Sequence, residues 1–230
     1  MEINIMSYRM NFIFDHTNTF CISVTDSRWK RMTRRFERES LEVMRWRATL
    51  PEEISNRAFF DGLNPLQRAC AQSHINIWKY ILEAELDYAF IMEDDACFKK
   101  GWRDALSELY QILYENVNET MPWDAIFLNA SEPMVSQDSW EIVKEQYFGG
   151  GYILSKAGAK WLLDRFSGLY YSTDWMTTRL QERGMSYSYY PWLIIQEGKE
   201  STIGSGVDLD HAKVVRCLEL ANYSIENYFI

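Results

Sequence analysis

The sequence predicts an α/β protein in which a mixed sheet is flanked by helices. Short apolar runs typical of buried strands alternate with longer segments whose apolar residues recur at helical spacing. The 230 residues, 47% of them hydrophobic, suffice for one large domain, and no internal repeat or low-complexity linker divides them. We therefore expect a single domain over 1–230, with an N-terminal extension over about 1–18 and a mobile loop and helix over about 197–230.

The expected strands are short, apolar and bounded by turn residues. They cover residues 20–24 (FCISV), 43–48, 87–92 (DYAFIM), 125–128, 152–154 and 187–190. Because helical patterns separate most of them, crossover connections are expected between the strands.

The expected helices carry starting signals. They cover residues 28–40, 65–84, 102–117, 156–166, a short segment from 174, and about 212–223. Thr25 to Ser27 can cap the first helix, and Ser155 can cap the fourth. Asn64 followed by Pro65 is typical of a cap with proline at the first helical position.

Composition argues against several classes of function. A net charge of −9 disfavours nucleic acid and anionic membrane surfaces as partners. No run approaches the roughly 18 apolar residues of a membrane span, and the N-terminus lacks a secretory pattern. The four cysteines are widely spaced without a CxxC pair, so we expect reduced thiols and no zinc site.

Three acidic residues, Glu93, Asp94 and Asp95, directly follow an apolar strand. Adjacent carboxylates repel one another, and a hard divalent cation such as Mg²⁺ or Mn²⁺ removes that repulsion. Ligands of open α/β sheets bind beyond the carboxyl ends of strands, and magnesium-type ions are commonly shared with substrate phosphates. The triplet therefore predicts a cation site for a nucleotide diphosphate, with a solvated acidic turn as the alternative.

The helix expected over residues 28–40 is strongly basic. Its arginines either form a solvated face, or Arg28 and Arg31 near its start meet a substrate phosphate or base.

Six sequence blocks carry a family resemblance. They are ISVTDSRWKRMTRRF, ACAQSHINIWKYI, YAFIMEDDACF, PWDAIFLNAS, GGGYILSKAGAKWLL with STDW shortly after, and PWLIIQEGKESTI. In this order, over about Phe20 to Ser201, they resemble glycosyltransferase family 25, which includes lipooligosaccharide and collagen galactosyltransferases. One departure is Val24-Thr25-Asp26, where the family's opening strand ends in an Asn-Leu-Asp type sequence.

The resemblance implies a GT-A type, Rossmann-like fold and a metal-dependent, inverting hexose transfer. The implied donor is a UDP-sugar, with galactose favoured over glucose, and the implied acceptor is a hydroxyl of a glycan or glycoprotein. The implied cofactor is Mn²⁺ or Mg²⁺. We expect a cytoplasmic protein, in a bacterium or a virus-infected host cell, that meets a membrane only through its acceptor.

The resemblance also suggests residue roles. The metal ligands would be Asp95, supported by Glu93 and Asp94, with His211 completing the shell. The donor would contact Ser23, Val24, Thr25, Arg28, Arg31, Ser73, His74, Glu93, Asp94, Gly149, Gly150 and Gly151. Asp174 is the candidate base and Glu141 the second candidate. A helix cap at Asp174, a structural His74 and a flexible glycine turn are the alternatives for these positions.

Two other functions stay open at this point. One is a metal-dependent phosphohydrolase or phosphotransferase, although the sequence Glu-Asp-Asp-Ala-Cys lacks the nucleophilic first aspartate of haloacid-dehalogenase-type enzymes. The other is a non-catalytic glycan-binding domain on the same fold, since a fold alone does not define a function.

Overall fold

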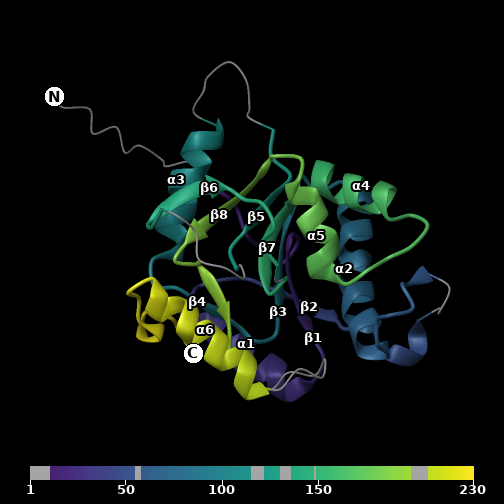
Figure 1. Cartoon of the computed structure of the whole chain (residues 1–230), viewed down its shortest axis with the longest axis horizontal. Helices are drawn as coiled ribbons and strands as arrows, with labels where there is room; N and C mark the ends of the chain where they lie inside the picture. The colour runs from purple at the N-terminus through teal and green to yellow at the C-terminus, as the bar shows by residue number, and fades with distance from the viewer. Residues whose placement is uncertain (1–10, 55–57, 115–121, 130–135, 148, 198–206) are drawn as a thin grey trace.

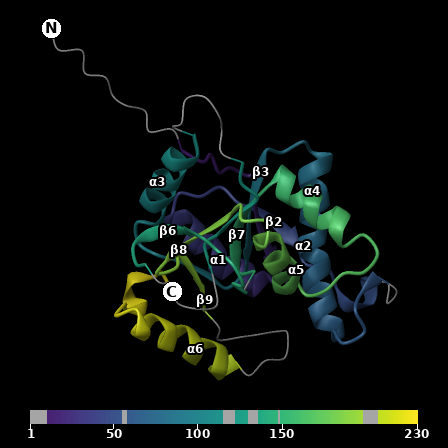
Figure 2. The ribbon, with the colours of Figure 1, turned by 45° about the horizontal axis from the view of Figure 1, so that its top comes forward.

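A seven-stranded mixed sheet forms the centre of the protein, with helices on both faces (Figure 1, Figure 2). The computed structural model describes residues 11–54, 58–114, 122–129, 136–147, 149–197 and 207–230. The strand order is β2-β1-β3-β7-β5-β8-β6, and a separate pair, β4-β9, lies beside this sheet. The predicted α/β class is confirmed.

The strands and helices have the following bounds. The large sheet contains β1 (Thr19–Ser23), β2 (Met44–Arg47), β3 (Tyr88–Glu93), β5 (Ala125–Phe127), β6 (Ser139–Ile142), β7 (Gly151–Ser155) and β8 (Ser186–Tyr190). The small pair is β4 (Ala96–Phe98) with β9 (Ile194–Gln196). The helices are α1 (Asp26–Arg38), α2 (Pro65–Glu83), α3 (Trp102–Tyr114), α4 (Lys156–Arg165), α5 (Thr173–Gln181) and α6 (Val207–Leu220), besides the short 3-10 turns η1 (Pro51–Glu53) and η3 (Ile225–Asn227).

Strand pairing brings several strand ends to one edge of the sheet. β1 and β3 are parallel, and Ile22 lies opposite Glu93. β7 runs antiparallel to β3, so Gly151 at its start lies opposite Met92 near the end of β3. β5 is antiparallel to β7 and therefore ends at the same edge. The candidate site lies at this edge.

The two faces of the sheet bury separate hydrophobic clusters. Phe20 and Ile22 pack on the face that α2, α4 and α5 cover, whereas Cys21 packs on the face that α1 and α3 cover. This alternation is the period-two rule for strands, and burial on both faces explains why the strands are apolar throughout.

The predicted helix caps are confirmed. The side chain of Thr25 accepts from the backbone N–H of Arg28 at the start of α1. Asn64 and Gln67 form a capping box around Pro65 at the first position of α2. Ser155 caps α4 by accepting from the N–H of Gly158.

The two ends of the chain differ from the expectation in detail. Phe12, within the predicted N-terminal extension, is buried and packs edge-on against Tyr88 and Trp123. The C-terminal helix begins at Val207 instead of about 212, and its Leu218 packs with residues of the small strand pair. The predicted mobile loop falls largely on 198–206, outside the described residues. Among the helices described, none has the length and apolarity needed to cross a membrane.

Candidate functional site

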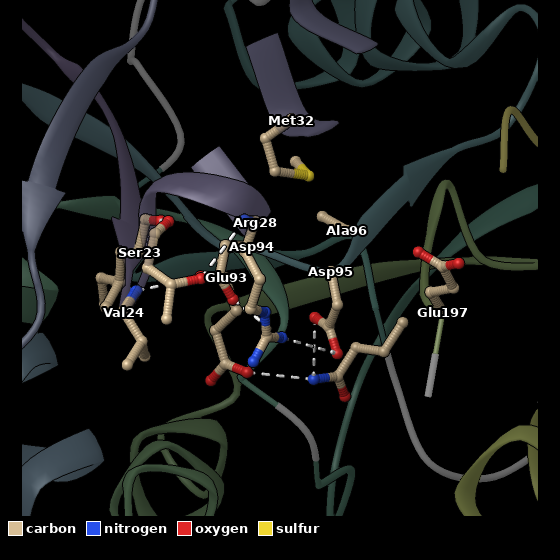
Figure 3. A network of polar contacts seen from close by, with 12 residues as sticks. Ser23, Val24, Arg28, Met32, Glu93, Asp94, Asp95, Ala96 and Glu197 are labelled. Carbon is tan, nitrogen blue, oxygen red and sulfur yellow. Dashed lines mark hydrogen bonds and ion pairs between the residues drawn. The ribbon is translucent and has the colours of Figure 1, made fainter. Parts of the chain in front are cut away.

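The acidic triplet lies in a turn between the two sheets (Figure 3). Glu93 is the last residue of β3, and β4 begins at Ala96. Because β3 is held by β1 and β7 while β4 is held by β9, the turn is fixed at both ends.

Asp94 is tied to the end of β1 and the start of α1. Its carboxylate accepts from the backbone N–H of Val24 at 3.0 Å and lies 2.8 Å from Nη2 of Arg28. Asp94 is 3% exposed. Burial raises the pKa of Asp94, and the positive charge of Arg28 opposes that rise. The Asp94 side chain therefore links the end of β3 to the start of α1.

The carboxylate of Glu93 has partners on both sides. Oε1 lies 3.2 Å from Nε2 of His74 and 3.8 Å from Sγ of Cys70. Oε2 accepts from the amide of Gln196 at 3.0 Å. Burial acts to raise the pKa of Glu93, but the hydrogen bond from His74, helped by the positive charge of Arg28, holds that pKa below its usual value.

A buried chain of hydrogen bonds orients His74. The indole N–H of Trp78 donates to Oη of Tyr152 at 2.9 Å, and Oη lies 2.9 Å from Nδ1 of His74. The phenol proton of Tyr152 can therefore be donated to Nδ1, which leaves the proton of His74 on Nε2, facing Glu93. His74 is fully buried, so its contacts are with the protein.

Asp95 is the most weakly engaged of the three acids. Its nearest polar neighbours are the amide of Gln196 at 3.5 Å and Nη2 of Arg28 at 4.0 Å. Burial, reinforced by the negative charge of Glu93, raises the pKa of Asp95 to about 7. A half-buried carboxylate beside two others, with a distant arginine, suits a hard divalent cation. The donor set of Asp95 and Glu93 thus fits Mn²⁺ or Mg²⁺.

A second buried arginine of α1 holds the far side of the site. Arg35 lies 2.6 Å from the carboxylate of Glu197 and donates to the carbonyl of Ala96 at 3.0 Å. The backbone N–H of Glu197 in turn donates to the carbonyl of Asp95 at 2.9 Å. Ala96, Asp95 and Glu197 are labelled in Figure 3. The arginines of α1 thus contribute to the site, beyond forming a solvated face.

The glycine run is explained by close packing. A Cβ on Gly150 would lie 2.6 Å from Cγ of Gln196, and one on Gly151 would lie 2.8 Å from Cδ1 of Ile194. Glycine at these two positions therefore lets β9 approach β7 and brings Gln196 to Glu93. Gly149 lies beside Thr173 and His74. The predicted approach to a donor sugar stays a prediction.

The predicted donor-binding residues at the end of β1 all lie beside the cluster. Ser23 is buried and donates to the carbonyl of Thr25, which itself caps α1. The side chain of Val24 is 47% exposed, while its N–H is bound to Asp94.

Three further predicted positions lie on helices α1, α2 and α6. Ser73 is buried, donates to the carbonyl of Ala69 and accepts from the N–H of Thr49, so its hydroxyl serves the fold. Arg31 is half-buried on α1, one turn beyond Arg28. The side chain of His211 lies outside the described residues.

The two candidate bases are far apart. Asp174, in the first turn of α5, accepts from the N–H of Trp175 at 2.9 Å, and its charge contributes to raising the pKa of the Cys70 thiol. Asp174 therefore belongs to the neighbourhood of Cys70 and Glu93. Glu141 lies on edge strand β6, four strands from β3, which is about 19 Å at the usual strand spacing. This position disfavours a direct role at the acidic cluster, and the role of Glu141 as a base stays a prediction.

Sequence reasoning missed part of the site. Gln196 and Glu197 lie in the last family block, and Tyr152 lies in the glycine block and the expected strand 152–154. None of the three is among the predicted site residues. Cys70 was expected to be an isolated thiol without a metal role, yet the ligand atoms of Cys70, His74 and Glu93 all lie within 4.8 Å of one another. The spacing of Cys70 and His74, four residues apart on one helix, was the available signal.

A mixed sheet covered by helices on both faces, with an acidic turn after a central strand, is the arrangement of a Rossmann-like glycosyltransferase fold. The chain belongs to glycosyltransferase family 25, because the model of that family, described as "LPS biosynthesis protein", matches residues 16–177, well over half of the chain. The family predicted from the six blocks is confirmed.

Curated relatives come from bacteria and animals. The chain is 27% identical over 176 residues to the lacto-N-neotetraose biosynthesis glycosyltransferase LgtE of Neisseria meningitidis serogroup B, covering 64% of this chain and 61% of that protein. It is 32% identical over 111 residues to procollagen galactosyltransferase 1-A of Xenopus laevis, covering 44% of this chain and 18% of that protein. A third relative, at 32% identity over 101 residues, is the probable inactive glycosyltransferase 25 family member 3 of Bos taurus, with 41% and 16% covered. The chain thus spans about three fifths of the first relative and less than a fifth of the other two.

Proposed function

We propose that this protein is a metal-dependent, inverting glycosyltransferase. It moves a hexose from a UDP-sugar to a hydroxyl of a glycan or a protein-linked acceptor, with galactose as the favoured sugar and glucose as the alternative. Family membership supports the class of reaction, and one relative is named a procollagen galactosyltransferase.

The observation that carries the proposal is the state of Asp95. Its carboxylate is half-buried, weakly engaged and next to Glu93, and its pKa is raised to about 7. A cation bound between these carboxylates relieves their repulsion and leaves coordination positions for phosphate oxygens. A solvated acidic turn would instead expose all three side chains, whereas Asp94 is 3% exposed.

The residues around the cation would divide the work. Asp95 and Glu93 would hold Mn²⁺ or Mg²⁺, which when bound neutralises the two phosphates and stabilises the leaving nucleotide. Gln196 contacts the Glu93 carboxylate on one side, and His74 contacts it on the other. The carboxylate is therefore held in place before the substrate arrives. Arg28 positions Asp94 and lies 4.0 Å from Asp95.

Asp174 is the proposed base for the acceptor hydroxyl. Inversion requires a group that removes the hydroxyl proton on the side opposite the leaving phosphate. One oxygen of Asp174 accepts from the N–H of Trp175, and no described residue is bonded to the other. That second oxygen is the one assigned to the proton.

Calorimetry of UDP binding, with and without Mn²⁺, tests the proposal. Mn²⁺ should be required for measurable affinity, and Asp95→Asn should weaken it at least about 100-fold because a direct metal ligand is lost. Asp164→Asn is the matched control, since Asp164 forms an exposed ion pair with Lys160 on α4. Equal UDP affinity with and without Mn²⁺ would refute the proposal.

One comparison favours a second function, a glycan-binding domain without turnover. A relative at 32% identity carries the description "probable inactive". Transfer or donor hydrolysis by the wild type, lost in Asp95→Asn and Asp174→Asn, would exclude it. Glycan binding without turnover of any UDP-sugar would support it. Phosphatase activity that survives Asp95→Asn would point instead to phosphohydrolase chemistry.

A further inference from the structure

Three potential metal ligands of different chemistry converge beside the acidic cluster. Cys70 and His74 lie one turn apart on α2, and both face the same oxygen of Glu93. Sγ of Cys70 is 3.8 Å and Nε2 of His74 is 3.2 Å from Oε1 of Glu93, and the three atoms lie within 4.8 Å of one another.

This spacing suits a tetrahedral ion. Thiolate, imidazole and carboxylate bind Zn²⁺ at roughly 2.0–2.3 Å, which places ligand atoms about 3.3–3.7 Å apart. The two contacts to Oε1, at 3.2 Å and 3.8 Å, lie just outside the two ends of this range. Without a metal, the two contacts are hydrogen bonds to Oε1, and an ion bound to all three ligand atoms would take their place. Three protein ligands also leave a fourth position open to water or an oxygen of a substrate, as in zinc sites that are not purely structural.

We propose that Cys70, His74 and Glu93 form a binding site for a thiophilic divalent cation, Zn²⁺ in the first place. Loading the site releases the thiol proton of Cys70 to solvent. His74 keeps one proton, which moves from Nε2 to Nδ1 as the metal takes the Nε2 lone pair. Nδ1 then donates to Oη of Tyr152, 2.9 Å away. Trp78 holds that phenol in place, so the outer partner of a metal-bound histidine is already built.

Glu93 separates this site from the site for the hard cation. Its Oε1 faces the sulfur and imidazole ligands, and its Oε2 faces Gln196, which also reaches Asp95. A bound Zn²⁺ therefore places positive charge beside Asp95 and draws on a carboxylate that the hard cation also needs. The structure thus assigns an inhibitory role to zinc, and this consequence alone rests on the proposed function.

Titration of the full-length protein with Cd²⁺, without nucleotide or Mn²⁺, tests the site. Cd²⁺ bound to a thiolate gives a near-ultraviolet charge-transfer band, which the wild type should show with one equivalent. Cys70→Ser should remove the band. It should also weaken Zn²⁺ binding by more than about 100-fold, as measured by competition with a coloured chelator. Cys217→Ser is the matched control, because Cys217 is a buried cysteine on α6, and its band should persist.

A second variant guards against a folding defect. Glu93→Gln keeps the shape of the side chain and should also weaken Zn²⁺ binding, while circular dichroism verifies the fold of each variant. A band that persists in Cys70→Ser, or that is absent from the wild type, overturns the site. Absence of the band together with Mn²⁺-dependent UDP binding overturns this inference alone. An intact band without Mn²⁺-dependent UDP binding overturns the proposed function alone.

Discussion

Two neighbouring regions of the acidic turn differ sharply in how their charges are satisfied. On the side of α1, Asp94 is closed by Arg28 and by the N–H of Val24. On the side of β9, the carboxylate of Asp95 lies 3.5 Å from the amide of Gln196 and 4.0 Å from Nη2 of Arg28, and its pKa is raised to about 7. Two identical, adjacent side chains therefore differ in their surroundings: Asp94 links two elements of the fold, and Asp95 is the proposed cation ligand. The following variants and conditions test this difference between Asp94 and Asp95.

The largest expected effect is on stability, from Arg28→Ala. Removing the guanidinium leaves Asp94 buried and unpaired, which should lower the free energy of unfolding by about 3–5 kcal/mol. Arg45→Ala on β2 removes an exposed ion pair with Asp26 and should cost less than about 1 kcal/mol. Urea unfolding measures both. Equal losses in the free energy of unfolding would mean that the contact between Asp94 and Arg28 does not stabilise the fold.

The pH dependence of the cation-free protein tests the open side. The pKa of Asp95 is about 7 in the folded protein, against an ordinary value of 3.8. Between about pH 4 and 7, the folded state therefore keeps a proton on Asp95 that the unfolded state has released. Stability should fall as pH rises through this window, by at most about 1.4 kcal/mol per pH unit.

Thermal unfolding in the presence of a chelator measures this slope. Asp95→Asn should flatten it, because the titrating group is gone, and Mn²⁺ should restore stability to the wild type at pH 8. If the Asn variant keeps the full slope, Asp95 is not the group responsible.

A smaller effect is expected from Tyr152→Phe, behind the Glu93 side of the turn. The change leaves the indole N–H of Trp78 buried without its acceptor and should cost about 1–3 kcal/mol in urea unfolding. Combining it with Trp78→Phe should cost less than the sum of the two single losses, since the two groups bond each other. Strict additivity would count against the hydrogen-bonded chain.

The smallest effect is expected from Glu141→Gln. Glu141 sits on β6, about 19 Å from the cluster across the sheet. We expect kcat/KM of the transferase to change by less than about twofold, against a large loss for Asp174→Asn. A comparable loss in both variants would undo the assignment of the base.

Local signals made most of the fold predictable. Thr25, Asn64 and Ser155 cap their helices as predicted, because a cap depends on neighbours within three residues. The strands β4, β6 and β9 were missed. Each has three or four residues, too few for a periodic pattern, and is stabilised by a partner distant in sequence.

The site was predictable only in part, for the same reason. The acids of β3 stand together in the sequence and were recognised. Gln196, which links Glu93 to Asp95, is 103 and 101 residues from them, and no local pattern connects it to them. Arg28 and Arg35 are seven residues apart and share one face of α1. Their burial follows from the acids opposite them, which composition alone does not reveal.

The small strand pair has a consequence for biosynthesis. Gln196 and Glu197 lie beyond residue 177, where the match to the family model ends, and Gln196 is the last residue of β9. During translation the acidic turn leaves the ribosome about 100 residues before the amide that orders it. A nascent or truncated polypeptide that lacks Gln196 therefore carries Glu93 and Asp95 without the amide that bridges them.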